Sequence, residues 1–307
     1  MKCFYHLDND GKCAGYWVRK FCEDNNIPFK QQDFVKMNYN IKFPINIIQD
    51  DEKVFIVDFS IDPKEMKELL NITKNIVWID HHKSAIDKYD KYPEIKDKIA
   101  GIRDLRFSGA ALTWWYYAKY MNIIPTTRTS SKVKGANDIV NAIETKCPYI
   151  TKLVDDHDCW KGRYSDSMPL KEGIEMEEAN EPWDALWDSL NSLEVKAYSR
   201  VLNNGKLAIK YRNSLSNYAM EMTSREYELE GLKCLIMNIP FKGSPWFGDK
   251  IDKYDAVIPY YFNTKTNTWE YSIYTNKDID VSLIAQKYGG GGHHSAAGFF
   301  TKECLFK

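Results

Sequence analysis

The stretch Ile76-Val77-Trp78-Ile79-Asp80-His81-His82 joins an apolar run of strand length to an acidic residue and two histidines. Val54-Phe55-Ile56-Val57 is a second run of this kind, and it ends at Asp58. Between the two runs, Asp62-Pro63-Lys64-Glu65 has the pattern of a helix start, with proline in the first turn. Strands that alternate with helices predict an α/β domain with a doubly wound, mostly parallel sheet.

The N-terminal residues repeat this arrangement. Lys2–Leu7 has the pattern of a short buried strand, and Asp8 and Asp10 follow it before a helix begins at Gly11. In a parallel sheet the carboxyl ends of neighbouring strands meet at one edge, where ligands bind. A single aspartate after a strand is most simply a helix N-cap. Three strands that each end in acidic residues, two of them with histidine nearby, instead predict a metal site at this edge.

All six histidines of the chain fall in four short clusters, three of which are rich in aspartate. The clusters contain His6, then His81 with His82, then His157, then His293 with His294. Imidazole combined with several carboxylates is a ligand set for divalent metals, and an oxygen-rich set favours Mn²⁺ or Mg²⁺ over a structural Zn²⁺. Two such ions about 3.5–4 Å apart catalyse the hydrolysis of phosphoesters.

The C-terminal part carries a run of four glycines, Gly289–Gly292, directly before His293. Glycine lets a backbone approach a ligand closely, and successive amides can bind an anion, so we expect a phosphate- or nucleotide-binding loop. Candidate strands at 232–238, 256–262 and 269–275 and a helix at about 281–288 precede or adjoin the run. They predict a second, smaller α/β domain.

The length of 307 residues suggests two domains, because single cores stop growing at about 250–300 residues. We expect a catalytic domain at 1–190, a helical linker at 191–215 and a substrate-binding domain at 216–307, with a cleft between the domains. Residues 137–154 are predicted to form one helical segment, and residues 183–230 are predicted to be largely helical.

Composition narrows the possible partners and the compartment. The net charge of −1 gives no global basic field for a long nucleic acid. The seven cysteines are odd in number and form no C-x-x-C pair, which favours reduced thiols and a cytoplasmic protein. We find no signal-peptide pattern and no apolar run near the roughly 18 residues of a membrane span, so no membrane partner is expected.

Taken together, the motifs resemble those of the DHH phosphoesterase family. Asp80-His81-His82 resembles the motif that names the family, His6-Leu7-Asp8-Asn9-Asp10-Gly11 its first motif, and Val57-Asp58 its second. Asp155-Asp156-His157-Asp158-Cys159-Trp160 resembles its fourth motif. Gly289 to Phe299 is similar to the signature of the DHHA1 domain that commonly follows the DHH domain.

This resemblance implies a two-metal phosphodiesterase, usually dependent on Mn²⁺, with Mg²⁺ as the other candidate. One ion would be held by His6, Asp8 and Asp58. The second would be held by Asp10, Asp58, His81 and one aspartate of the fourth motif. For that position we expect Asp156, with Asp155 and Asp158 as the alternatives.

The resemblance also assigns roles around the metals. His82 would contact the scissile phosphate or transfer a proton, beside His81, and Asp80 would orient a histidine. The far end of the substrate would be held by the glycine run and the histidines after it, which are Gly290, Gly291, Gly292, His293 and His294.

The compact chain and its near-neutral charge favour a short substrate. We expect a metal-dependent nuclease that hydrolyses short oligonucleotides or dinucleotides, as an exonuclease or a nano-RNase-like enzyme. A cyclic dinucleotide phosphodiesterase and a nucleotide 3′-phosphatase are the alternatives within the same chemistry. The alternative without catalysis is a nucleotide-binding module. A homodimer is left open.

Overall fold

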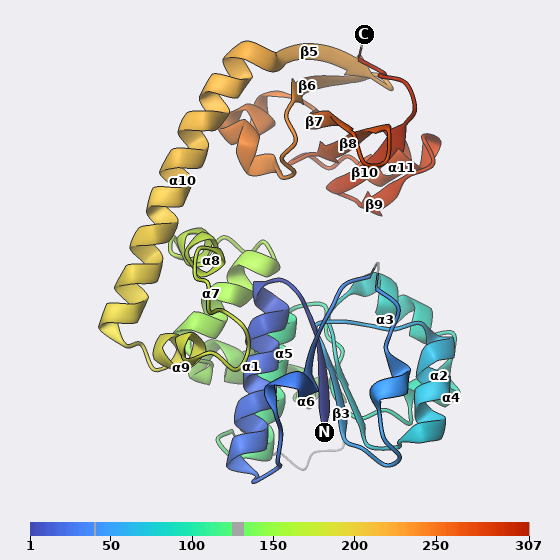
Figure 1. Ribbon diagram of the computed structural model, residues 1–307, viewed down its shortest axis with the longest axis vertical. Coiled ribbons are helices and arrows are strands. Elements are labelled where there is room, and N and C mark those ends of the chain that lie inside the picture. The colour runs from blue at the N-terminus through green and yellow to red at the C-terminus, as the bar shows by residue number, and fades with distance from the viewer. Residues whose placement is uncertain (40, 125–131, 307) are drawn as a thin grey trace. The chain divides into compact units, whose positions relative to one another are not determined.

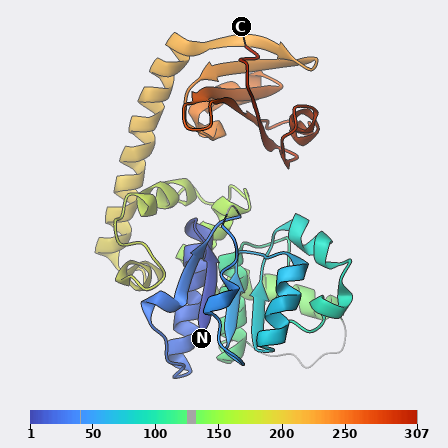
Figure 2. The same ribbon diagram turned by 45° about the vertical axis from the view of Figure 1, so that its right-hand side comes forward.

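The computed structural model describes residues 1–39, 41–124 and 132–306. The chain divides into two compact units, Met1–Lys206 and Leu207–Lys307, and each is described here by itself. Figures 1 and 2 show the elements of both units. In the described ranges, no helix combines the length and the apolar character that crossing a membrane requires.

The first unit is built on a parallel sheet with the strand order β2-β1-β3-β4. Its strands are β1 (Lys2–His6), β2 (Phe34–Met37), β3 (Val54–Val57) and β4 (Ile76–Ile79). The chain passes from β1 to β2 on one side and then returns to place β3 on the other side of β1. The strand order therefore reverses between β1 and β3, and ligands bind at such a point in open α/β sheets.

Helices cover both faces of this sheet (Figure 1). On one face Tyr5 and Val57 join a core with the helices α1, α5, α6, α7, α8 and α9, which span Asn9–Asp24, Gly109–Tyr120, Lys132–Lys146, Tyr149–Asp158, Ser167–Glu175 and Ala185–Asn191. On the other face Phe4 and Ile56 join a core with α2, α3 and α4, which span Pro63–Ile72, Lys83–Tyr89 and Pro93–Lys96. The two cores arise because successive side chains of a strand point to opposite faces.

Local sequence explains where several helices begin and end. The Asp8 carboxylate accepts a hydrogen bond from the Gly11 amide and so caps α1. Pro63 opens α2, and Asp62 caps it. The single helical segment predicted at 137–154 is instead two helices, α6 and α7, separated at Pro148. Proline cannot continue a helix, because it has no N–H to donate and its ring clashes with the preceding turn.

The second unit contains a six-stranded mixed sheet with the order β5-β6-β7-β8-β10-β9. Its strands are β5 (Ser224–Leu229), β6 (Leu232–Asn238), β7 (Ala256–Asn263), β8 (Thr268–Tyr274), β9 (Gly291–His293) and β10 (Ala296–Thr301). Only the β6–β7 pair among them is parallel. Its core includes residues of α11 (Val281–Lys287), and the helix α10 (Val195–Thr223) leads into β5. The predicted fold class, a parallel α/β sheet followed by a second, smaller domain, is confirmed.

Two sequence predictions are wrong in detail in this unit. The helical prediction for 183–230 fails after Thr223, where β5 begins. The glycine run is not only a loop, because β9 pairs with β10 as an antiparallel hairpin. A β-carbon at Gly290 would lie 2.1 Å from the Gly298 carbonyl oxygen, and one at Gly292 would lie 2.5 Å from that of Ala296. Close packing of the hairpin therefore requires glycine at these positions, with or without a ligand.

Candidate metal centre

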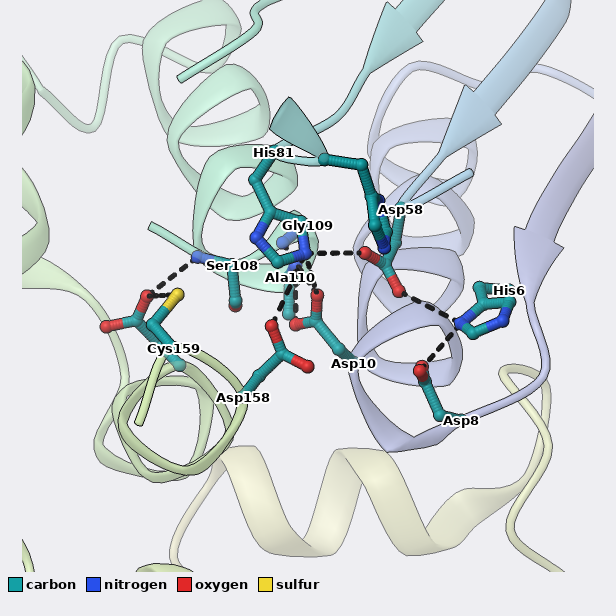
Figure 3. Close-up of polar contacts among 12 residues, drawn as sticks. His6, Asp8, Asp10, Asp58, His81, Ser108, Gly109, Ala110, Asp158 and Cys159 are labelled. Carbon is teal, nitrogen blue, oxygen red and sulfur yellow. Dashed lines mark hydrogen bonds and ion pairs between the residues drawn. The ribbon is translucent and has the colours of Figure 1, made fainter. Parts of the chain in front are cut away.

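Histidines and aspartates that follow β1, β3 and β4 converge at one edge of the parallel sheet (Figure 3). His6 ends β1, and Asp58 and His81 follow β3 and β4. Asp158, the last residue of α7, approaches the same place from the side of the helices. In two groupings of these residues, the potential ligand atoms all lie within 4.8 Å of one another. The first grouping is His6, Asp8 and Asp58, and the second is Asp58, His81 and His82.

Asp58 lies at the centre of this arrangement. Its Oδ1 is 3.1 Å from His81 Nε2, and its Oδ2 is 3.8 Å from His6 Nδ1. The side chain is 1% exposed, and neither oxygen has a hydrogen-bond donor among the described residues. Its backbone is left-handed with φ of 50°, which is uncommon outside glycine and clusters at functional sites. Burial, followed by the charges of Asp10, Asp8 and Asp158, raises the pKa of Asp58 well above its usual range.

The first grouping places His6 between two carboxylates. His6 Nδ1 is 2.6 Å from Asp8 Oδ2, and Asp8 Oδ1 accepts the hydrogen bond from the Gly11 amide. Burial acts to raise the pKa of Asp8, but the contacts with His6 and Gly11 outweigh it and lower that pKa. Asp8 is therefore ionised at neutral pH and able to bind a cation.

The second grouping centres on His81. Its Nε2 is 3.1 Å from Asp58 Oδ1 and 3.3 Å from Asp158 Oδ2. Burial lowers the pKa of His81, which favours the neutral imidazole, and that is the form that binds metals. Burial and the neighbouring carboxylates Asp10 and Asp8 raise the pKa of Asp158. Two carboxyl groups with raised pKa values, Asp58 and Asp158, beside a neutral His81 are a favourable place for a divalent cation.

Asp10 is held differently, at the N-terminus of α5. Its Oδ2 accepts a hydrogen bond from the Gly109 amide at 2.7 Å, and its Oδ1 accepts one from Ala110 at 3.0 Å. The free amides at a helix N-terminus stabilise an anion in this position. Asp10 Oδ2 still lies 3.8 Å from His81 Nε2, so this carboxylate borders the second grouping.

Asp80 orients His82 rather than His81. The Asp80 side chain is fully buried, and its Oδ1 is 2.7 Å from His82 Nδ1. The same oxygen accepts hydrogen bonds from the amides of His81 and His82. Burial acts to lower the pKa of His82, but the hydrogen bond to Asp80 and the nearby negative charge raise it. His82 Nε2 is the ring nitrogen that remains for a ligand.

The fourth motif was predicted to supply Asp156, with Asp155 and Asp158 as the alternatives, and the structure places Asp158 beside His81. Asp156 accepts hydrogen bonds from the Arg163 and Tyr164 amides and from the Ser167 hydroxyl, so its oxygens are already used. Asp155 accepts a hydrogen bond from the Ser108 amide and forms an ion pair with Lys161. Of the three aspartates, Asp158 is the one with an oxygen beside His81 Nε2.

Sequence reasoning missed two contributors to this site. Ser108 and Gly109 lie outside the motifs identified in the sequence, although their amides hold Asp155 and Asp10. Cys159 was noted only as part of a motif, yet its sulfur belongs to a third grouping with His81 and Asp158, again with ligand atoms within 4.8 Å. Spacing along the chain carries no signal for either contact, because both depend on how α5 and α7 pack against the sheet.

A small cavity of about 140 Å³ adjoins the cluster on the side of α7 and α8. Asp8, Asp10 and Asp158 line it together with Asn9, His157, Ser167 and Lys171, over an apolar floor of Val154, Leu170 and Ile174. Burial lowers the pKa of His157, so this ring lines the cavity in its neutral form at neutral pH. The cavity is small compared with the roughly 300–1,000 Å³ of pockets for drug-sized ligands.

In the second unit, the predicted substrate-binding residues lie at the hairpin after α11. The Gly290 amide donates to the Ala285 carbonyl at the end of that helix, so it is not available to an anion. Gly291 and Gly292 pair with β10. The His294 side chain is exposed, and its Nε2 is 3.4 Å from Asp278 Oδ1. The side chain of His293 lies outside the described part of the structure.

The residues of the first unit fit a pair of divalent ions. Burying an ionised carboxylate without a partner costs several kcal/mol, so Asp58, whose two buried oxygens have no hydrogen-bond donor among the described residues, would be stabilised in its ionised form by a cation on each side. Imidazole nitrogen and carboxylate oxygen are both suitable ligands for Mn²⁺. Imidazole is less suitable for Mg²⁺, which prefers oxygen ligands.

No family model matches the chain. A curated relative is the uncharacterized protein R106 of Acanthamoeba polyphaga mimivirus, which is 23% identical over 292 residues. The match covers 90% of this chain and 59% of the relative, so the chain spans well under two thirds of that protein's length.

Solved structures share the fold over nearly the whole chain. The exonuclease RecJ bound to manganese matches with a TM-score of 0.53 and 12% identity, over 99% of this chain and 86% of that one. The DHH domain of a protein from a family of ribosomal proteins matches with a TM-score of 0.53 and 14% identity, over 98% and 82%. The pGpG-specific phosphodiesterase PggH of Vibrio cholerae matches with a TM-score of 0.50 and 11% identity, over 98% and 93%.

These neighbours define a class by its fold: a DHH domain with a parallel sheet, followed by a DHHA1 domain with a mixed sheet. This chain has the fold of the DHH/DHHA1 phosphoesterases, which confirms at the level of fold the resemblance found in its motifs.

Proposed function

We propose that this protein is a two-metal phosphodiesterase that hydrolyses short oligonucleotides or dinucleotides. The observation that carries the proposal is the position of Asp58, whose two buried, unpaired oxygens face His81 and His6. A carboxylate in this position would serve as a ligand shared by two cations. In two-metal phosphoesterases the ions lie about 3.5–4 Å apart, a separation that one bridging carboxylate can span.

The ligands divide into two sets around Asp58. His6, Asp8 and Asp58 would hold one ion, and Asp58, His81 and Asp158 would hold the other, with Asp10 at its border. When bound, such ions polarise the phosphoryl oxygens, lower the pKa of a coordinated water and stabilise the charge on the leaving oxygen. The oxygen-rich ligand set favours Mn²⁺, and Mg²⁺ is the second candidate.

His82 and Asp80 supply the protein's part in proton transfer. Asp80 Oδ1 accepts from the His82 and His81 amides, so Asp80 is an acceptor there and His82 Nδ1 carries the proton between them. The remaining nitrogen, His82 Nε2, would hold a proton against a phosphoryl oxygen or pass it to the leaving oxygen. Asp80 is a positioning residue for this step, because it touches the histidine and not the substrate.

Two observations support a short substrate. The cavity beside the metal cluster has a volume of about 140 Å³, which suits a single sugar or terminal group rather than a length of polymer. PggH, which shares the fold, is a phosphodiesterase specific for pGpG, a linear dinucleotide.

A hydrolysis panel supplemented with Mn²⁺ tests this proposal. It contains a linear dinucleotide, RNA and DNA oligomers of graded length, cyclic dinucleotides, a nucleotide 3′,5′-bisphosphate and pyrophosphate. We expect the fastest cleavage for the dinucleotide and the shortest oligomers, with rates that fall as length increases. Faster cleavage of cyclic dinucleotides would identify a cyclic dinucleotide phosphodiesterase instead. Faster release of the 3′-phosphate would identify a nucleotide 3′-phosphatase. Binding of metal and nucleotide without cleavage of any substrate would instead identify a binding module.

A further inference from the structure

A thiol lies within the metal cluster and has no part in the proposed reaction. Cys159 follows α7 directly, and its sulfur, His81 Nε2 or Nδ1 and a carboxylate oxygen of Asp158 lie within 4.8 Å of one another. Figure 3 shows the three side chains on the same side of the site. Of the seven cysteines, all in the described part of the chain, only Cys159 and Cys304 are not buried. Cys159 is therefore partly accessible to solvent, and its thiol donates a 3.8 Å hydrogen bond to Asp155 Oδ1.

One distance within this group, between His81 and Asp158, has the length found in tetrahedral coordination. With metal–ligand bonds of about 2.0–2.3 Å, two ligands of a tetrahedral ion lie roughly 3.3–3.8 Å apart. His81 Nε2 and Asp158 Oδ2 are 3.3 Å apart, which is one edge of such a tetrahedron. The sulfur needs to move by no more than about one ångström to complete a face, which a cysteine side chain achieves within its rotamer.

Two neighbouring carboxylate oxygens favour a cation at this point. Asp158 Oδ2 is buried, although the residue as a whole is partly exposed, and it has no hydrogen-bond donor among the described residues. Asp58 is fully buried and equally without a donor, and its Oδ1 lies 3.1 Å from His81 Nε2. Both oxygens are thus directed at the nitrogen that would bind the ion.

The ligand types select which ions bind here. A sulfur ligand favours soft or borderline ions such as Zn²⁺ and Cd²⁺, whereas Mn²⁺ and Mg²⁺ favour carboxylate oxygen. His81 Nε2 has a single lone pair and can bind one ion at a time. An ion bound to Cys159 and His81 therefore excludes the Mn²⁺ that the same nitrogen would hold together with Asp58.

We propose that His81, Asp158 and Cys159 form a second, thiolate-containing site for Zn²⁺ or Cd²⁺ that competes with Mn²⁺ for His81. On binding, the Cys159 S–H bond breaks, its proton passes to solvent, and the sulfur forms a bond to the ion with no change in oxidation state. The competition with Mn²⁺ rests on the proposed function, under which Zn²⁺ or Cd²⁺ would occupy one of the two metal positions. The site rests on the geometry of the cluster and needs no turnover.

Cd²⁺ binding followed by ultraviolet absorption tests the site directly, because a cadmium–thiolate bond gives a charge-transfer band that oxygen and nitrogen ligands do not. The full-length, metal-free protein is titrated with CdCl₂ alone. We expect a band that saturates at one equivalent in the wild type, is lost in Cys159→Ser, and persists in Cys304→Ser, which removes the other accessible thiol. The band should fall as Mn²⁺ is added in increasing excess.

The outcomes separate this inference from the proposed function. A band of equal intensity in Cys159→Ser, or a band that Mn²⁺ never reduces, would overturn the site. Circular dichroism shows whether Cys159→Ser is folded. The Mn²⁺ signal in electron paramagnetic resonance shows whether this variant still binds Mn²⁺. The assay needs no substrate, so a protein that fails to hydrolyse any phosphodiester can still show the band, and an active enzyme can lack it.

Discussion

A β-carbon at Gly109 would lie 2.4 Å from the β-carbon of Asp58 and 2.8 Å from its Oδ1. The first residue of α5 therefore packs directly against the central carboxylate of the metal cluster. The same residue donates its amide to Asp10. Gly109 thus sets the position of two acidic side chains at once, although it has no ligand atom of its own.

We predict that Gly109→Ala displaces Asp58 and weakens Mn²⁺ binding. Overpacking of this kind typically costs about 1–3 kcal/mol of stability. Isothermal titration with Mn²⁺ and thermal unfolding measure the two effects. Gly291→Ala is a suitable control, because a β-carbon there meets no atom within 4 Å. Unchanged Mn²⁺ affinity in Gly109→Ala would show that the close approach to Asp58 does not matter for the metal.

Asp58→Asn should remove the shared ligand of both ions. We expect phosphodiesterase activity to fall by more than the about 10–100-fold that is typical for residues that only support a metal ligand. In the wild type, Mn²⁺ at 100 times its Kd should stabilise the fold by about 2.7 kcal/mol. Most of this stabilisation should be absent from the variant.

Asp51→Asn is the matched control for this substitution. Asp51 has the same left-handed backbone, with φ of 56°, but lies exposed on the surface. Asparagine tolerates this conformation as aspartate does. If Asp51→Asn and Asp58→Asn lose equal activity and Mn²⁺-dependent stability, the backbone and not the bridging carboxylate is responsible.

The raised pKa of Asp58 predicts a pH dependence of stability in the metal-free protein. A carboxyl group of raised pKa binds its proton more tightly in the folded chain than in the unfolded one. Its contribution is therefore fully present below the unfolded pKa of about 3.9 and is lost as pH rises through the folded pKa. We expect the wild type to lose stability relative to Asp58→Asn as pH rises above the unfolded pKa of about 3.9 and through the raised pKa of the folded protein.

Urea unfolding with EDTA at several pH values measures this difference. Added Mn²⁺ should increase the free energy of unfolding of the wild type most strongly at the higher pH, because the ion replaces the proton on the carboxylates. A difference between wild type and variant that stays constant across the range would contradict the predicted shift.

Asp158→Asn and Asp156→Asn should have opposite consequences. Asp158→Asn removes an unpaired oxygen beside His81 and should weaken the binding of one ion with little loss of stability. Asp156→Asn keeps the metal cluster but disturbs three hydrogen bonds from Arg163, Tyr164 and Ser167. We expect it to destabilise the fold by about 1–3 kcal/mol. Mn²⁺ stoichiometry and urea unfolding measure the two effects. If Asp156→Asn loses an ion and Asp158→Asn loses stability instead, Asp156 is the metal ligand of the fourth motif.

Gly290→Ala should disrupt the β9–β10 hairpin, because the added carbon would meet the Gly298 carbonyl at 2.1 Å. We expect faster hydrogen exchange in residues 291–301 and a lower Tm of the second unit. Gly291→Ala is the neighbouring control with open space around it. Equal hydrogen exchange in the two variants would indicate that the glycine run serves ligand binding and not the packing of the hairpin.

The sequence alone predicted the inventory of the candidate site and determined the layout of the sheet that gathers it. Apolar runs that end in Asp8, Asp58 and Asp80 predict parallel strands, and neighbouring parallel strands deliver their carboxyl ends to one edge. This physical rule links residues more than seventy positions apart without any knowledge of side-chain packing. The same pattern underlies the resemblance to the DHH family, which the fold confirms.

Only the tertiary structure decided which residues of this inventory face one another. Asp155, Asp156 and Asp158 all lie on α7, where each residue turns by about 100°, so the rotation of the helix selects Asp158. The packing of α5 against Asp58 requires Gly109, and the pairing of β9 with β10 accounts for glycines that the sequence suggested for a ligand. These contacts depend on the angles and distances between elements, which a one-dimensional pattern does not contain.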